Sequence, residues 1–170
     1  GIEAESVSGD VSIKAARIDK LELSSVSGDV SFDGEAQRAD VETVSGDVRL
    51  SGASGEFSVE SVSGNADVRV ASVREFEGSS VSGDIDFDGD VAAGGRLDVE
   101  SMSGDVGIML PAGVSARVSA ESFSGRLDNE FGLAVEDEEG PGSTMRGKLG
   151  DGSATIEIES FSGDVRLRKR

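Results

Sequence analysis

The chain has 170 residues, of which 34 are acidic and 16 basic, so its net charge at neutral pH is −18. This surplus of negative charge opposes binding to nucleic acid or to anionic lipid headgroups. Cysteine and histidine are both absent, which excludes thiol catalysis, a Ser/His triad, and metal sites built from thiolates or imidazoles. We therefore expect no catalytic residue, no nucleic-acid partner and no bound cofactor other than a cation held by carboxylates.

The chain shows no division into parts. Its longest apolar runs are only a few residues, far below the roughly 20 that a membrane-spanning helix needs. No linker or shift in composition separates one half from the other. We expect a single domain over residues 1–170, with membrane anchoring only through a segment absent from this chain.

The dominant feature is a Ser-Gly motif, completed by Asp in most copies, that recurs along the whole chain. Its glycines are Gly9, Gly28, Gly46, Gly64, Gly83, Gly104, Gly125 and Gly163. Neighbouring copies lie 18 to 21 residues apart, and the last interval of 38 fits two periods with one eroded copy. A period of this length predicts about nine stacked supersecondary units.

Apolar and polar residues alternate on both sides of each motif. Examples are Val30-Ser-Phe32 after a glycine and Leu97-Asp-Val99-Glu-Ser101 before one. Such alternation is typical of β-strands with one buried face, so each period is expected to hold two short strands and two turns. The motif glycine is predicted to adopt a positive φ in the first turn, and a looser, glycine-containing turn of variable length closes the period.

Two all-β topologies fit this pattern: a parallel β-solenoid, or an antiparallel meander of hairpins. In a parallel stack each residue lies about 4.8 Å from its counterpart in the next coil, which favours columns of identical residues. Such columns of Val, Ser and Gly recur here. We therefore predict a single-domain parallel β-solenoid (β-helix) of about nine coils, with two short strands per coil of 18 to 21 residues.

Residues 110–170 carry four motifs in a characteristic order. They are Leu110-Pro-Ala-Gly-Val, Val118-Ser-Ala-Glu-Ser-Phe-Ser-Gly, Arg146-Gly-Lys-Leu-Gly-Asp-Gly and Ile156-Glu-Ile-Glu-Ser-Phe-Ser-Gly-Asp-Val-Arg-Leu-Arg. This segment resembles the C-terminal end of the bacterial putative-adhesin repeat family, also called domain of unknown function 4097, and the earlier repeats resemble its body. The resemblance implies a right-handed β-solenoid without catalytic residues, located in the cell envelope, either periplasmic or on the cell surface. The departures are Arg126 at an Asp position and the acidic insertion at 136–139.

One column of the repeat is rich in carboxylates. The residue after the motif glycine is Asp10, Asp29, Asp47, Asn65, Asp84, Asp105, Arg126 or Asp164. Stacked carboxylates repel one another, and shared calcium would relieve that repulsion. Alternatively, each Asp accepts hydrogen bonds from the backbone of its own turn. The interruptions at Asn65 and Arg126 favour the second interpretation.

A short acidic run resembles the start of an EF-hand loop. Residues 84–90 match its first positions, but Gly95 stands where the bidentate glutamate belongs, and the alternation is that of a strand. Asp84, Asp86 and Asp88 should still share one outward face. We retain these three as weak candidates for a surface calcium site.

The apolar column two residues before the motif glycine is predicted to point outward and to form an interaction stripe. Its members are Val7, Val26, Val44, Val62, Val81, Met102, Phe123 and Phe161. The alternative is a set of corner positions half covered by loops of the adjacent coils.

These features favour a non-enzymatic scaffold or adhesion module of the cell envelope whose partner is a protein or a surface glycan. One alternative is self-association, in which the solenoid polymerises through its open ends. The basic tail at 166–170 is predicted to place positive charge at one end of the acidic rod and to guide this contact. A second alternative is a polysaccharide-active enzyme, because paired carboxylates can cleave glycosidic bonds. No pair of carboxylates is singled out by the sequence, which disfavours it.

Overall fold

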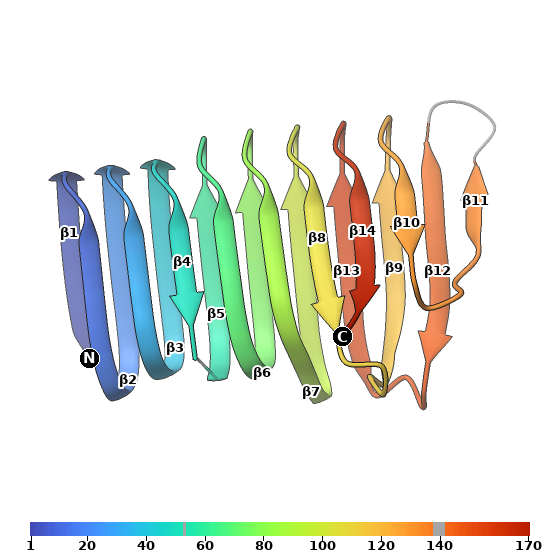
Figure 1. The fold of residues 1–170 in the computed structure, drawn as a ribbon, viewed down its shortest axis with the longest axis horizontal. Coiled ribbons are helices and arrows are strands. Elements are labelled where there is room, and N and C mark those ends of the chain that lie inside the picture. Colours follow the sequence, from blue (N-terminus) through green and yellow to red (C-terminus); the bar gives the residue numbers. More distant parts are fainter. Residues whose placement is uncertain (53, 138–141) are drawn as a thin grey trace.

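The computed structural model describes residues 1–52, 54–137 and 142–170, and in these ranges it contains strands but no helix. The first seven strands are β1 (Ile2–Ser8), β2 (Val11–Ser27), β3 (Val30–Ser45), β4 (Val48–Ser51), β5 (Ser54–Ser61), β6 (Ala66–Ser80) and β7 (Ile85–Ser101). The others are β8 (Val106–Leu110), β9 (Ala116–Ser122), β10 (Leu127–Asn129), β11 (Val135–Asp137), β12 (Ser143–Leu149), β13 (Ala154–Ser160) and β14 (Val165–Lys169). All of them belong to one sheet that is wound into a flattened rod (Figure 1).

Successive coils pair in parallel and in register. In the pairing of β2 with β3, Val11 lies opposite Val30 and Leu23 lies opposite Val41. Apolar residues therefore stack on apolar residues from coil to coil, as the columns of like residues in the sequence predict. The prediction of an all-β parallel solenoid is confirmed, and the meander is excluded for the repeats.

The second turn predicted in each period does not interrupt the strands in four of the coils. In four coils the two expected short strands merge into β2, β3, β6 and β7, which continue through that corner. The coils differ in length there, and register shifts between Ala15 and Ile18 and between Arg69 and Ser72 absorb the difference. The ladder of hydrogen bonds thus bends through the corner instead of breaking.

The last coil of the chain lies inside the array rather than at its end. β13 pairs in parallel with β7 on one side and with β9 on the other. Likewise, β14 lies between β8 and β10. The C-terminus consequently lies against β8 (Figure 1), so the basic tail at 166–170 does not mark an end of the rod, and the prediction that it does is wrong.

The eroded copy between Gly125 and Gly163 is not a coil. Its residues form β11 and β12, and β12 pairs antiparallel with β9 while β11 pairs antiparallel with β12. The rod therefore has fewer coils than the nine predicted, and this end is covered by antiparallel strands. Glu136 of the acidic insertion belongs to β11, whereas residues 138–141 lie outside the described residues.

The core is a thin layer between the two faces of the flattened coil. Its largest fully buried side chains include Phe32, Phe76 and Phe87, and the rings of the last two lie with their centroids 5.0 Å apart. Gly78 leaves the space that the Phe76 ring occupies. Each such buried apolar side chain contributes about 1.5–3 kcal/mol, and the column structure repeats this contribution in every coil.

Candidate functional site

The motif glycines stack directly on one another at one corner of the rod. A Cβ atom on Gly46 would overlap the carbonyl oxygen of Gly28, and each later motif glycine meets its neighbour in the same way. Among the eight motif glycines, only Gly9 and Gly28 have φ in the left-handed region, at 128° and 144°. The predicted positive φ is therefore wrong for the other six, where glycine is needed for close backbone approach.

Two serines stabilise this corner: one lies three residues before the motif glycine, as Ser80 does before Gly83, and the other directly precedes the glycine, as Ser82 does. The Ser80 hydroxyl donates to the Gly83 carbonyl at 2.9 Å and accepts from the Gly83 N–H at 3.0 Å, which closes its own turn. The Ser82 hydroxyl donates to the Val62 carbonyl of the preceding coil at 3.3 Å. One serine thus shapes the turn and the other joins neighbouring coils.

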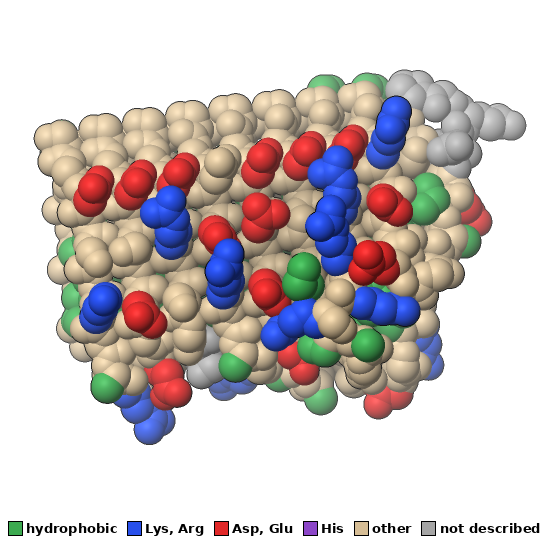
Figure 2. Space-filling view, viewed as in Figure 1, with side chains coloured by type: hydrophobic (Ala, Val, Ile, Leu, Met, Phe, Trp, Pro, Cys, Tyr) green, Lys and Arg blue, Asp and Glu red, His purple; other side chains and the backbone are tan. Residues whose placement is uncertain are grey.

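The carboxylate column forms a ladder between coils. The Asp29 carboxylate accepts from the backbone N–H of Asp47 at 3.0 Å, and the Asp47 carboxylate accepts from that of Asn65 at the same distance. Each Asp therefore caps the next coil, so the prediction that it caps its own turn is wrong. Figure 2 shows the ladder as a line of acidic side chains along one edge of the visible face.

The inserted coil explains the irregular positions in this ladder. In space the order is Asp10, Asp29, Asp47, Asn65, Asp84, Asp105, Asp164 and Arg126. Arg126 ends the ladder, with its N–H donating to Asp164. Asn65 preserves it, because its amide oxygen accepts from the Asp84 N–H at 3.0 Å.

The predicted stripe is exposed along the whole rod. The exposed fraction of its side chains runs from 46% at Val62 to 75% at Val7. The insertion of β13 beside β9 places Phe161 next to Phe123, and their rings stack with centroids 4.9 Å apart and an interplanar angle of 6°. The stripe therefore changes from valines at the N-terminal coils to Met102 and two aromatic rings at the other end.

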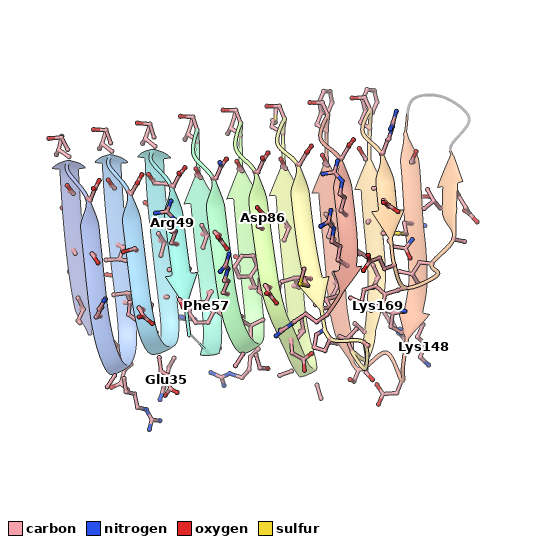
Figure 3. All side chains as sticks on the ribbon, viewed as in Figure 1. Glu35, Arg49, Phe57, Asp86, Lys148 and Lys169 are labelled. Carbon is pink, nitrogen blue, oxygen red and sulfur yellow. The ribbon has the colours of Figure 1, made fainter. Side chains whose placement is uncertain are left out.

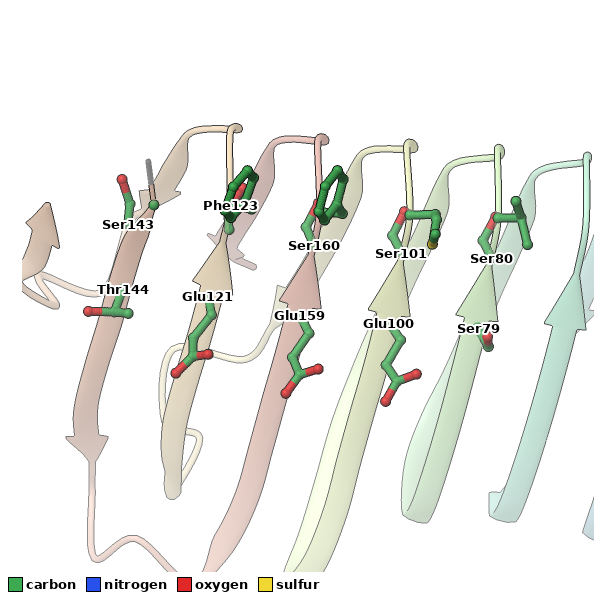
Figure 4. Close-up of a pocket in the computed structure, with 15 residues that line it drawn as sticks. Ser79, Ser80, Glu100, Ser101, Glu121, Phe123, Ser143, Thr144, Glu159 and Ser160 are labelled. Carbon is green, nitrogen blue, oxygen red and sulfur yellow. The ribbon is translucent and has the colours of Figure 1, made fainter. Parts of the chain in front are cut away.

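A groove of about 470 Å³ runs beside the aromatic end of the stripe. It crosses β6, β7, β13, β9 and β12. One side is formed by Val81, Met102, Phe161 and Phe123, and the other by Ser79, Glu100, Glu159, Glu121 and Thr144. Figure 4 shows the three glutamates side by side on neighbouring strands, all pointing to the same side of the sheet.

The glutamates of the groove are crowded. Glu121 is paired with Arg146 of β12 at 2.7 Å. Partial burial, together with the negative charges of Glu100 and Glu121, raises the pKa of Glu159. The groove therefore combines an apolar side with a side of incompletely balanced negative charge.

The calcium candidates do not come together as a site. Asp84 accepts the Asp105 N–H at 2.9 Å, and Asp88 pairs with Arg170 at 2.9 Å. Asp86 lies on the outward face (Figure 3), and partial desolvation and its acidic neighbours raise its pKa. Among the described residues no group of three acidic side chains is arranged to hold a metal ion.

Comparison with known proteins places the chain in a family. A family model described as Toastrack DUF4097 matches residues 1–168. The chain belongs to the Toastrack family. A solved structure of a Clostridium sporogenes protein, described as a putative cell adhesion protein, is similar over 100% of this chain and 94% of that one, at 11% identity and a TM-score of 0.39. No curated protein matches the chain.

The residues of the stripe and of the Asp ladder in this Toastrack chain were predicted from repeating positions in its sequence, but the groove was not predicted. It depends on β13 lying between β7 and β9, which brings Glu159 between Glu100 and Glu121. The signal available in the sequence was the pair Glu-Ser-Phe-Ser-Gly at 121–125 and 159–163, which differs from the other copies by its phenylalanine. In the described part of this Toastrack chain, no helix is long and apolar enough to cross a membrane.

Proposed function

We propose that this Toastrack chain is a non-enzymatic scaffold and adhesion module of the cell envelope that binds a protein or glycan partner through its apolar stripe. The observation that carries the proposal is the row of exposed apolar side chains, one per coil, on a rigid rod. Monomeric proteins rarely expose a contiguous apolar surface of this kind unless it binds something. The resemblance of residues 110–170 to the putative-adhesin repeat family supports adhesion as the use of that surface.

The proposed absence of catalysis is supported by the chemistry of the surface. Cys and His are lacking, and the carboxylates of the ladder are occupied by backbone N–H groups of the next coil. We expect no release of reducing sugar from any polysaccharide incubated with the protein. Sustained turnover that is lost in the variant E100Q/E159Q would establish the enzymatic alternative instead.

The test of adhesion uses beads coated with the protein and surfaces coated with peptidoglycan, dextran or collagen. We expect firm attachment to at least one surface, reduced about tenfold in the stripe variant V62S/V81S/M102S/F161S. The matched control is R49S/D67S, two outward substitutions on the other sheet face that leave net charge unchanged. Equal attachment of stripe variant and control, or no attachment by any protein, would overturn the proposal.

Self-association is a second candidate, and one observation favours it. Among the described residues, β1 pairs only with β2, and the first residues of β2 pair only with β3, so these residues supply no partner strand for the other edge of this coil. A second copy could add strands there. The opposite end is formed by β12 and the three-residue strand β11, which are antiparallel to the coils and do not match the β1 edge. Pairing of one β1 edge with another would therefore give dimers.

A further inference from the structure

The groove beside the aromatic end has two chemically different walls. Met102, Phe161 and Phe123 form one wall, and Glu100, Glu159 and Glu121 form the other. The serine between them in each strand turns inward and is buried, so the outward side chains on either side of it stand as parallel ridges. Along each ridge the spacing is the rise of one coil, about 4.8 Å.

The charge on the glutamate wall is only partly balanced by the protein. Arg146 pairs with Glu121, but no lysine or arginine of the described chain forms an ion pair with Glu100 or Glu159. Glu159 lies opposite Glu100 on one neighbouring strand and opposite Glu121 on the other. A cation placed along this row would relieve the repulsion between the carboxylates. A binding partner for this wall therefore carries positive charge.

The charge pattern also disfavours a second copy as the occupant. The stripe is bordered by the glutamate column on one side and by the Asp ladder on the other. Two copies meeting stripe to stripe would bring carboxylates against carboxylates, which costs free energy. The Phe123 and Phe161 rings stack on each other, which covers one face of each ring. Together with Met102 they form an apolar wall on which aliphatic side chains can pack.

We propose that this groove binds a basic, amphipathic polypeptide segment of another protein. Its Lys or Arg side chains pair with Glu100 and Glu159, and its aliphatic side chains pack on Met102, Phe161 and Phe123. This inference rests on the proposed function, because it names the chemistry of the partner that the aromatic end of the stripe takes.

The N-terminal coils provide an internal comparison. There the same two columns place Glu42 beside Val44 and Glu60 beside Val62, with smaller apolar side chains and no aromatic pair. Removing two charges there changes the net charge of the protein as much as removing two in the groove. A difference between the two sites therefore reports on the groove and not on overall charge.

The experiment measures the binding of a synthetic peptide of about ten residues, a Trp followed by alternating Lys and Leu, which is long enough to span the groove. The protein lacks Trp and Tyr, so the fluorescence of the peptide reports binding directly. We expect binding that weakens about tenfold in E100Q/E159Q and in F123S/F161S. E42Q/E60Q and V44S/V62S should change it by less than about threefold, and a Glu/Leu peptide should not bind.

Three results would overturn the inference: no binding of the Lys/Leu peptide, equal weakening by E100Q/E159Q and E42Q/E60Q, or equally strong binding of a Lys/Ser peptide. Circular dichroism of each variant verifies that the rod remains folded. If the peptide fails while bead attachment still depends on the stripe, the inference falls and the proposed function stands. If attachment is indifferent to the stripe, the proposed function itself falls.

Discussion

At the residue scale, the repeated motif is a set of contacts between neighbouring coils. Its first serine closes the turn, its second serine donates to the coil before, and its Asp accepts from the coil after. The glycine between them lets two backbones approach more closely than any side chain would allow. Stacking therefore constrains each residue type, which explains why the same residues return in most periods.

Gly46→Ala should destabilise the protein by about 1–3 kcal/mol, because its methyl group would overlap the Gly28 carbonyl and force two coils apart. Thermal unfolding of the variant measures this loss. The matched control is Gly113→Ala, where a Cβ meets nothing within 4 Å and φ is not in the left-handed region. Equal stability of the two variants would contradict the stacking role of the glycine.

Asp47→Ala should cost about 1 kcal/mol, since it removes the acceptor for the Asn65 N–H. Asp47→Asn should cost less than about 0.5 kcal/mol, because an amide oxygen can accept the same hydrogen bond. Asn65 already does so for Asp84. Chemical denaturation compares the two, and an Asn variant as unstable as the Ala variant would show that charge, not the hydrogen bond, matters.

At the element scale, the inserted C-terminal coil joins two parts of the rod. β13 and β14 separate β7 and β8 from β9 and β10. Without them, β9 would lose its parallel partner and keep only antiparallel β12. The end of the chain is therefore needed to complete the middle of the rod, which makes the two chain ends unequal in their importance for stability.

A chain ending at Ser153 should lose hydrogen-exchange protection at those amides of Ala116–Ser122 that bond to β13, although that segment and its other partner, β12, are still present. A chain lacking residues 1–10 should lose protection only in β2, which is the strand that pairs with β1. Unchanged protection of all amides of Ala116–Ser122 in the first variant would contradict the dependence of β9 on β13.

The sequence predicted the features that depend on contacts between consecutive coils. It did not predict the features that arise where the order of coils in space differs from their order in the chain. The columns of Val, Ser, Gly and Asp specified a parallel stack and the exposed stripe, because register follows from like residues meeting like. The residues of β13 do not reveal whether its coil stacks after the coil of β9 and β10 or inserts between that coil and the coil of β7 and β8. The position of β13 was therefore not predicted. The eroded copy was counted as a coil for the same reason, although its strands β11 and β12 are antiparallel.

At the scale of the whole molecule, crowded carboxylates make stability depend on pH. Partial desolvation and neighbouring acids raise the pKa values of Asp86 and Glu159. A raised pKa means that the folded state binds the proton more tightly than the unfolded state, so these groups add stability as the pH falls through their folded-state pKa values. This gain is complete below the pKa values of the unfolded chain.

The unfolding temperature should therefore rise as the pH is lowered from neutral into the mildly acidic range. D86N/E159Q should show a flatter dependence, because both titrating groups are gone. E42Q/E60Q removes the same amount of charge and should keep the original dependence. An unchanged slope in D86N/E159Q would assign the effect to other carboxylates.

The central claim is that this rod acts on another molecule through its side and not on itself. Sedimentation velocity with light scattering, from micromolar to millimolar protein and with calcium or chelator, tests it most directly, with detection at peptide wavelengths because Trp and Tyr are lacking. The account predicts a monomer of 17.4 kDa throughout. Growth with concentration would contradict it and assign self-association to the unpaired edge of β1 or to the stripe, and growth only with calcium would assign a metal-binding role to the Asp ladder.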